Sequence, residues 1–402
     1  MSRTFRRGIN RNVVALGFVS LLTDFSTEMI LPVLPLFITG VLRASVSSLG
    51  LIEGVAESLS SLLRLFSGWL SDRIQRRKPF VVLGYGLSGA AKWTLALAAS
   101  WPAVLILRAS DRVGKGLRNP PRDALIADSV EHADLGAAFG FHRALDTLGA
   151  ALGPLAAFLI LRAWPGGFRR VFAWSALPAA LSIVVLLVFV HAPRAAVRGG
   201  GSGAAPARAP LGGAFRRFLV VAGLFSLGNS SVAFLLLRAQ GVGIGAAQVP
   251  LVYLVYNLIY ALLSWPVGIW TDRAGRRPAL LGAYALFAAV YGFLAVTATP
   301  AGVIAAFALL GVHSALLEGS QRSLVADLVP PERRATAFGL YYMVVGTALL
   351  PASAMAGLLW DRFGPRSAFA VDAGLAALST LLFAVLLPGH RESEDRHRAQ
   401  PA

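Results

Sequence analysis

The chain has 402 residues, of which 56% are hydrophobic and only 14% carry a charge. Soluble proteins carry about 25% charged residues, so this composition excludes an ordinary soluble globular protein. The net charge of +17 does not indicate a nucleic-acid-binding protein, because the basic residues gather in short loops between apolar runs, and the absence of cysteine excludes disulfides and thiolate metal sites.

Twelve segments are apolar and each is long enough to cross about 30 Å of hydrocarbon as a helix. The first contains Asp24 and Pro32 and is not followed by a small-residue cleavage site, so we interpret it as a spanning helix and not as a signal peptide. Basic residues are concentrated in alternate loops, which predicts a multi-pass protein of the cell (inner) membrane with both termini in the cytoplasm. The predicted spans are 13–39, 46–70, 80–100, 102–128, 138–162, 168–190, 216–238, 246–270, 279–298, 300–328, 335–360 and 366–388.

A segment rich in Gly, Ala, Pro and Arg lies between the sixth and seventh spans. It has no apolar period and is typical of a flexible linker. We therefore expect an all-α membrane protein of two pseudo-symmetric six-helix bundles. The expected boundaries are an N-terminal bundle at 1–191, a cytoplasmic linker at 192–215, a C-terminal bundle at 216–390 and a cytoplasmic tail at 391–402.

The two halves repeat one another. GWLSDRIQRRKP begins at Gly68 and returns as GIWTDRAGRRPA at Gly268, and ALIADSVEHADLGAAFGF returns as SLVADLVPPERRATAFGL. Six spans per half keep both copies in the same orientation, which favours a binding site between the halves near the membrane midplane. The paired motif resembles the loop 2–3 signature G-x-L-A-D-R-x-G-R-R of the major facilitator superfamily, with Ser71, Gln75 and Trp270 as departures. The resemblance implies the twelve-helix fold of that superfamily and a secondary transporter.

The repeated motif is expected to control conformation. Glycine lets two helices approach closely, and an aspartate at a helix–loop junction can cap a neighbouring helix. The resemblance also implies that Arg76 pairs with Asp128, in a contact that breaks when the transporter opens outward; basic anchoring at the membrane surface is the alternative. The motif residues are Gly68, Asp72, Arg73, Arg76, Asp128, Gly268, Asp272 and Arg273.

The fourth span carries DRVGKGLRNPPRD, with six charged residues in thirteen. Helical spacing places the basic side chains of Arg108, Arg112, Lys115 and Arg122 on one face, and Pro120 and Pro121 are expected to break the helix beyond them. The segment resembles the superfamily's fourth-span pattern R-x-x-Q-G-x-G, with Lys115 in place of Gln and Arg118 in place of the second Gly.

A basic stripe inside a membrane needs acidic partners, because unpaired charge there costs several kcal/mol or more. The first half supplies these acids, so we expect a polar network around a water-filled cavity: Asp24, Glu28, Glu53, Glu57, Asp111, Asp123 and Asp146. The second half has few charges, chiefly His313, Glu318 and Arg322. It offers aromatic and neutral polar side chains instead, at Asn229, Ser230, Tyr253, Tyr256, Asn257, Tyr260, Tyr341 and Tyr342. This division favours proton or ion chemistry in the first half and substrate contact in the second.

The fifth span contains GAALGPLAA. Gly149, Gly153 and Pro154 resemble the G-x-x-x-G-P core of the antiporter motif of drug/proton exporters, although Ala156 and Ala157 replace its closing glycines. The resemblance implies export; ordinary close packing of a small-residue helix is the alternative.

The main hypothesis is a proton-coupled exporter of small organic molecules that works by alternating access. Asp24 is the first candidate for the proton carrier, followed by Glu28, Glu57 and Asp146, and a permanent ion pair of Asp24 with Arg112 or Lys115 is the structural alternative. The candidate substrate residues are Arg112, Lys115, Arg118, Asn229, Tyr253, Tyr256, Asn257 and Glu318.

Three other functions stay open. The basic stripe could bind an organic anion such as a carboxylate metabolite or a siderophore. A metal cation exporter would use Asp24, Glu28, Glu53 and Glu57, but the absence of cysteine and the scarcity of histidine disfavour a transition metal. A non-transporting membrane receptor is the third. We expect no enzyme activity, no cofactor, no resident metal and no nucleic-acid partner, and we expect a monomer in the lipid bilayer whose partners are protons and a small-molecule substrate.

Overall fold

The computed structural model of the protein describes residues 9–74, 77–131, 134–191, 211–330 and 333–387. These ranges are helical and contain no strand. Ten stretches of them are long and apolar enough to cross a membrane. The prediction of an all-α membrane protein is confirmed. Most of the predicted linker, at 192–210, and the predicted tail at 391–402 lie outside the described residues.

The helices follow the predicted spans in order. The first half comprises α2 (Arg11–Ile30), α3 (Leu34–Leu36), the π-helix η1 (Phe37–Val41), α4 (Val46–Ile74), α5 (Lys78–Leu95), α6 (Trp101–Asp128), α7 (Leu135–Ala163) and α8 (Phe168–Phe189). The second half comprises α9 (Gly213–Leu227), α10 (Val232–Gly241), α11 (Val249–Ala274), α12 (Arg276–Val296), α13 (Pro300–Asp327), α14 (Arg334–Phe363) and α15 (Pro365–Leu386).

Two predicted spans are interrupted, and they occupy equivalent places in the two halves. The first span stops at Ile30 and resumes as α3 and η1, because Pro32 and Pro35 cannot donate the backbone hydrogen bonds of a continuous helix. The seventh span stops at Leu227, and Ser231 caps the start of α10 by accepting a hydrogen bond from the N–H of Ala233. The sequence analysis predicted each as a single helix.

The fourth span shows the opposite error. Pro120 and Pro121 were expected to break it, but α6 continues through both and ends at Asp128. A membrane-spanning chain keeps its backbone polar groups paired, and neighbouring helices allow proline inside a helix at small cost.

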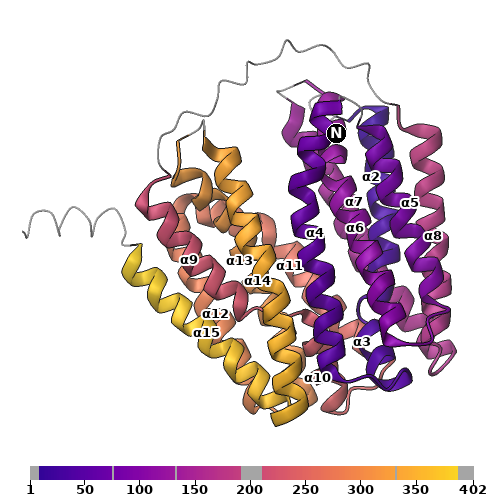
Figure 1. The fold of residues 1–402 in the computed structure, drawn as a ribbon, viewed down its shortest axis with the longest axis vertical. Helices are drawn as coiled ribbons and strands as arrows, with labels where there is room; N and C mark the ends of the chain where they lie inside the picture. Colours follow the sequence, from indigo (N-terminus) through magenta and orange to yellow (C-terminus); the bar gives the residue numbers. More distant parts are fainter. Residues whose placement is uncertain (1–8, 75–76, 132–133, 192–210, 331–332, 388–402) are drawn as a thin grey trace, which may run out of the picture.

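The helices form two groups that meet at one end (Figure 1). We call the end at which α2 begins and α4 ends the terminal end, and the opposite one the far end. Figure 1 shows the two groups splayed apart at the terminal end and drawn together near α3 and α10 at the far end. The far end is held by α4 against α14: a Cβ at Gly50 would lie only 2.2 Å from the carbonyl oxygen of Ser353.

Asp361, in the last turn of α14, also closes the far end. Its carboxylate accepts hydrogen bonds from the backbone N–H of Val46 at 3.0 Å and of Ser47 at 2.8 Å. These donors belong to the first turn of α4, whose N–H groups have no partner within the helix. An acid of the second half therefore caps a helix of the first half.

Candidate transport site

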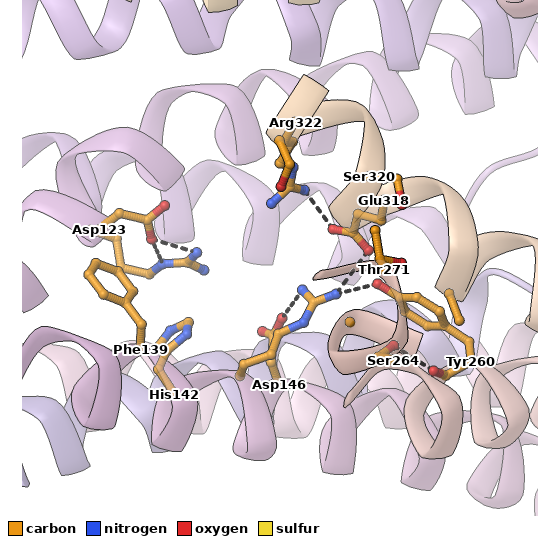
Figure 2. Close-up of a pocket in the computed structure, with 15 residues that line it drawn as sticks. Asp123, Phe139, His142, Asp146, Tyr260, Ser264, Thr271, Glu318, Ser320 and Arg322 are labelled. Atoms are coloured by element: carbon orange, nitrogen blue, oxygen red, sulfur yellow. Dashed lines mark hydrogen bonds and ion pairs between the residues drawn. The ribbon is translucent and has the colours of Figure 1, made fainter. Parts of the chain in front are cut away.

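A polar cavity of about 490 Å³ lies between the two groups of helices, toward the terminal end. Figure 2 shows Asp123, Phe139, His142 and Asp146 on one wall, facing Tyr260, Ser264, Thr271, Glu318, Ser320 and Arg322 on the other. The first wall comes from α6 and α7, and the second from α11 and α13. Because the far end is closed by α4 and α14, this conformation presents the cavity toward the terminal end.

Arg143 joins the two walls. Its guanidinium lies 3.3 Å from the carboxylate of Asp146 on α7, 2.8 Å from the hydroxyl of Tyr260 on α11 and 3.5 Å from the carboxylate of Glu318 on α13. These three contacts are drawn in Figure 2. Glu318 also pairs with Arg322 at 2.6 Å. A single side chain thus connects charged groups that belong to opposite halves of the molecule.

Asp146 belongs to a second contact, with α2. Its carboxyl group and that of Asp24 lie in hydrogen-bonding contact, and Ser20 donates a further hydrogen bond to Asp146 at 2.5 Å. The local packing explains this proximity. A Cβ at Gly149 would lie 2.3 Å from the backbone oxygen of Leu21, so α7 can reach α2 only through glycine.

Glu28 lies one turn beyond Asp24 and faces the second half. It contacts Tyr253 of α11, and a Cβ at Gly153 would lie 2.6 Å from the Cβ of Glu28. Glu28 is half-buried and one of its carboxylate oxygens has no hydrogen-bond partner among the described residues. The helix contact at Gly149 and Gly153 therefore positions both acids of α2.

Tyrosines of α11 form a ladder beside a second cavity of about 360 Å³. The rings of Tyr253 and Tyr256 stack with centroids 5.7 Å apart, and those of Tyr256 and Tyr260 with centroids 6.4 Å apart. Tyr256 and Tyr260 line this cavity together with Glu318, and Tyr341 and Tyr342 of α14 do so from another side. Flat aromatic faces and a few polar groups are typical of sites for organic molecules.

Two other predicted substrate residues lie apart from this cavity lining. Asn257 donates a hydrogen bond to the backbone oxygen of Ala150 at 3.3 Å, across the contact of α11 with α7. Asn229 lies in the break between α9 and α10. Both are half-buried.

The basic stripe of α6 is matched by acids of α4. Arg108 binds Glu53 at 2.9 Å, and Arg112 binds Glu57 at 2.9 Å. Arg112 therefore pairs with Glu57, whereas the sequence left open a pair with Asp24. Lys115 makes no ion pair within 4 Å among the described residues.

Arg118 lies on a different face of α6 from this stripe. Its buried guanidinium stacks over the ring of Tyr85 in α5, 4.5 Å from the ring centroid. It lines neither of the two cavities between the halves.

The repeated motif forms a basic–acidic pair in each half. Arg77 binds Asp128, and Arg276 binds Asp327. Arg276 occupies the position equivalent to Arg76, which itself lies outside the described residues. The pair of Arg76 with Asp128 therefore stays a prediction, and in the described part of the chain Asp128 is bound by the neighbouring Arg77.

Other motif residues behave differently in the two copies. A Cβ at Gly68 would be in ordinary contact with Pro120 at 3.5 Å, and one at Gly268 would meet nothing within 4 Å. The expected close helix approach at Gly268 is thus absent in this conformation, because Gly268 lines the open cavity. Arg73 and Arg273 are exposed. The side chains of Asp72 and Asp272 lie outside the described part of the chain.

Arg143, Arg64 and Asp372 are among the charged groups that sequence reasoning missed. Arg143 follows the helical spacing i, i+3 with Asp146, a signal that was available. Arg64 lies on the face of α4 that also carries Glu57. It is close enough to Tyr342 of the other half for an electrostatic interaction. Asp372 of α15 was overlooked when the second half was described as poor in charge, and it is 1% exposed.

The sequence of this chain is similar to those of known proteins. The family model of the Major Facilitator Superfamily matches residues 16–237 and 218–402. An uncharacterised MFS-type transporter of Methanocaldococcus jannaschii is 37% identical over 387 residues, which cover 94% of this chain and 95% of the relative. Over a shorter stretch of 188 residues, 46% of each chain, the multidrug resistance protein MdtG of Proteus mirabilis is 27% identical.

Among solved structures, the nucleoside transporter NupG has a TM-score of 0.79 at 13% sequence identity, with 94% of this chain and 100% of that chain covered. At this identity the similarity concerns the fold. The chain belongs to the major facilitator superfamily and is a multi-pass membrane transporter.

Proposed function

We propose that the protein is a proton-coupled exporter of small organic molecules that works by alternating access. The contact between the carboxyl groups of Asp24 and Asp146 is the observation that carries this proposal. Two carboxylates in contact repel each other strongly, so such a pair holds a proton between them and can exchange it. Asp146 also lines the cavity, which gives the proton a route to water.

Arg143 links this proton site to the opposite half. When the acid pair carries its negative charge, Asp146 holds Arg143 toward α7; when the pair is neutralised, Glu318 and Tyr260 are the partners that remain. The charge of the acid pair therefore alters a contact between the halves. A transporter needs such a link, because the coupling ion acts only through interactions that differ between the two conformations.

The cargo site in this proposal is the tyrosine-lined space between α11, α13 and α14. Tyr256, Tyr260 and Tyr342 offer apolar faces and hydroxyl groups, and Glu318 lies among them as an ion pair with Arg322. Aromatic rings accept varied flat molecules without a fixed hydrogen-bond pattern. This chemistry favours amphipathic organic compounds over inorganic ions.

We further propose that a monomer operates with its terminal end in the cytoplasm and in the inner membrane. Basic side chains at that end, such as Arg11, Arg73, Arg273 and Arg334, support this orientation. The cavity then opens inward, where an exporter collects its cargo. The Gly149, Gly153 and Pro154 segment and the similarity to a multidrug resistance protein support export.

The decisive experiment measures transport in proteoliposomes with an imposed pH gradient, using a compound found by a growth-inhibition panel in an efflux-deficient host. Asp24→Asn should abolish gradient-driven transport while leaving expression and substrate exchange without a gradient intact. Glu131→Gln, which changes an exposed acid at the terminal end, is the matched control and should behave as the parent protein. Unchanged gradient-driven transport by Asp24→Asn would reject the proposal.

An organic anion is the second candidate cargo, and one observation favours it. Lys115 and Arg64 make no ion pair within 4 Å among the described residues, whereas Arg112 is already bound to Glu57. These two bases could hold a carboxylate. Competition by matched anionic and neutral analogues separates the two cargos, because only the anionic analogue should lose affinity in Lys115→Gln.

A further inference from the structure

A buried acid lies in the second half, away from the cavities described above. Asp372 is in α15, and its side chain is 1% exposed. It lines neither cavity between the halves. The proton site proposed at Asp24 and Asp146 lies in the first half, so Asp372 is separate from that site.

Asp372 points at the break in the seventh span. Its Oδ2 accepts a hydrogen bond from the hydroxyl of Ser230 at 2.5 Å, and Ser230 lies between α9 and α10. The helices are close there, because a Cβ at Gly228 would lie 2.9 Å from the backbone oxygen of Asp372. The Oδ1 atom is buried and has no hydrogen-bond partner among the described residues.

Among the residues that the structure describes, no cation lies beside Asp372 to balance a negative charge. The elements packed against α15 are α9, α12 and α14, and the titratable group that they bring near it in the described part of the chain is Tyr291 of α12. Tyr291 is 2% exposed and is a neutral neighbour. Glu53, which is 6% exposed, shows the contrast, since Arg108 binds it at 2.9 Å.

The free-energy cost of burying a negative charge decides whether Asp372 is ionised or protonated. An isolated carboxylate inside a protein is destabilised by several kcal/mol unless a cation or several donors surround it. Ser230 supplies its hydroxyl and its backbone N–H as donors, and no cation joins them among the described residues. A protonated carboxyl group needs fewer hydrogen-bond donors than a carboxylate, because it is uncharged and its carbonyl oxygen can accept the same hydrogen bond from the Ser230 hydroxyl.

We propose that Asp372 is a second proton-binding site of the transporter, in which Oδ1 carries the proton and Oδ2 accepts the hydrogen bond from Ser230 in this conformation. The site does not depend on the cargo, on the direction of transport or on the role of Asp24. It adds a protonatable carboxyl group in the second half to the acid pair proposed for the first half.

The position of this site connects it to the closed far end. Ser231, next to Ser230, lies 3.5 Å from the carboxylate of Glu53 in the first half, and α10 packs against α3. Release of the proton would leave a carboxylate beside the unpaired N–H groups at the start of α10, which attract negative charge. Protonation of Asp372 therefore affects the segment that joins the two halves at the far end.

Infrared spectroscopy of the purified full-length protein in lipid at neutral pH tests the proposal. The difference between the parent protein and Asp372→Asn should show the loss of one C=O stretching band of a protonated carboxyl group, and this band should shift in D₂O. Glu131→Gln, which changes an exposed acid at the terminal end, is the control and should remove only carboxylate bands. Loss of carboxylate bands alone in Asp372→Asn would overturn the proposal.

A second variant covers the case in which Asp372→Asn does not fold. Ser230→Ala keeps the acid and removes its hydroxyl donor, so the protonated-carboxyl band should move to higher frequency without loss of intensity. A spectrum of Ser230→Ala with the same protonated-carboxyl bands as the parent protein would also overturn the assignment.

Discussion

Single side chains decide how the halves communicate, and Arg143 is the clearest example. Its guanidinium contacts Asp146 in its own half and Tyr260 and Glu318 in the other. More than half of its side chain, 55%, is exposed, so these contacts are too weak to be explained as a contribution to folding stability. These contacts of Arg143 instead connect Asp146 of the acid pair to the opposite wall of the cavity.

Replacement of Arg143 should therefore impair transport more than stability. Arg143→Met removes polar contacts that contribute up to about 1 kcal/mol each for an exposed side chain, so transport should fall by about fivefold or more. Arg162→Met is the matched control on the same helix, because Arg162 is exposed in the last turn of α7. Transport rates in proteoliposomes and elution in gel filtration separate the two effects. Equal transport by both variants would contradict the coupling role.

At the scale of helices, the contact between α2 and α7 places the acids. Gly149 and Gly153 let α7 approach the backbone of α2 at the level of Asp24 and Glu28. In the sequence these two glycines resemble the core of the antiporter motif. Their structural effect is to bring a helix that lines the cavity into contact with the candidate proton carriers.

Gly153→Ala should separate α2 from α7. The new methyl group would lie 2.6 Å from the Cβ of Glu28 and 2.7 Å from its backbone carbonyl carbon, and such overpacking costs about 1–3 kcal/mol. The unfolding temperature in detergent should fall by several degrees. Gly140→Ala, in the same helix, meets nothing within 4 Å and should leave the temperature unchanged or slightly higher. A similar temperature for both variants would show that the close approach is unimportant.

The sequence predicted the helices well and their interactions less well. Apolar length sets the spans, and the resemblance implied for the first half an arginine–aspartate contact of the kind that Arg276 and Asp327 make in the second half. The contact of Arg77 with Asp128 was not predicted, because adjacent arginines at a helix junction can both reach one acid. Asp372 was overlooked because its one side-chain hydrogen-bond partner, Ser230, comes from a helix break that the apolar pattern does not reveal.

For the whole molecule, the contacts at the far end decide which end of the transporter is closed in this conformation. The far end is closed by α4 against α14 and by Asp361, while the cavity keeps the halves apart at the terminal end. Alternating access requires the far-end contacts to break when the terminal end closes. Weakening them should therefore favour the opposite conformation without any change in the cavity.

Asp361→Ala removes the acid that caps α4 and should shift the population toward the state open at the far end. The contact is exposed, so we expect a loss of about 1 kcal/mol, which is about a fivefold change in the equilibrium. The chain has no cysteine, so spin labels can be attached at introduced cysteines without background. Exposed positions Ile74 and Thr336 report the terminal end, and Leu97 and Val296 report the far end.

Distance distributions from electron spin resonance should lengthen at the far end and shorten at the terminal end in Asp361→Ala. Glu131→Ala removes an exposed acid of the loop between α6 and α7 and should leave both distributions as in the parent protein. Distances that lengthen at the far end without shortening at the terminal end would indicate local fraying of α4. Rigid-body rocking of the two halves requires both changes together. In that motion each group of helices moves as one body about the site between them, so one end closes as the other opens.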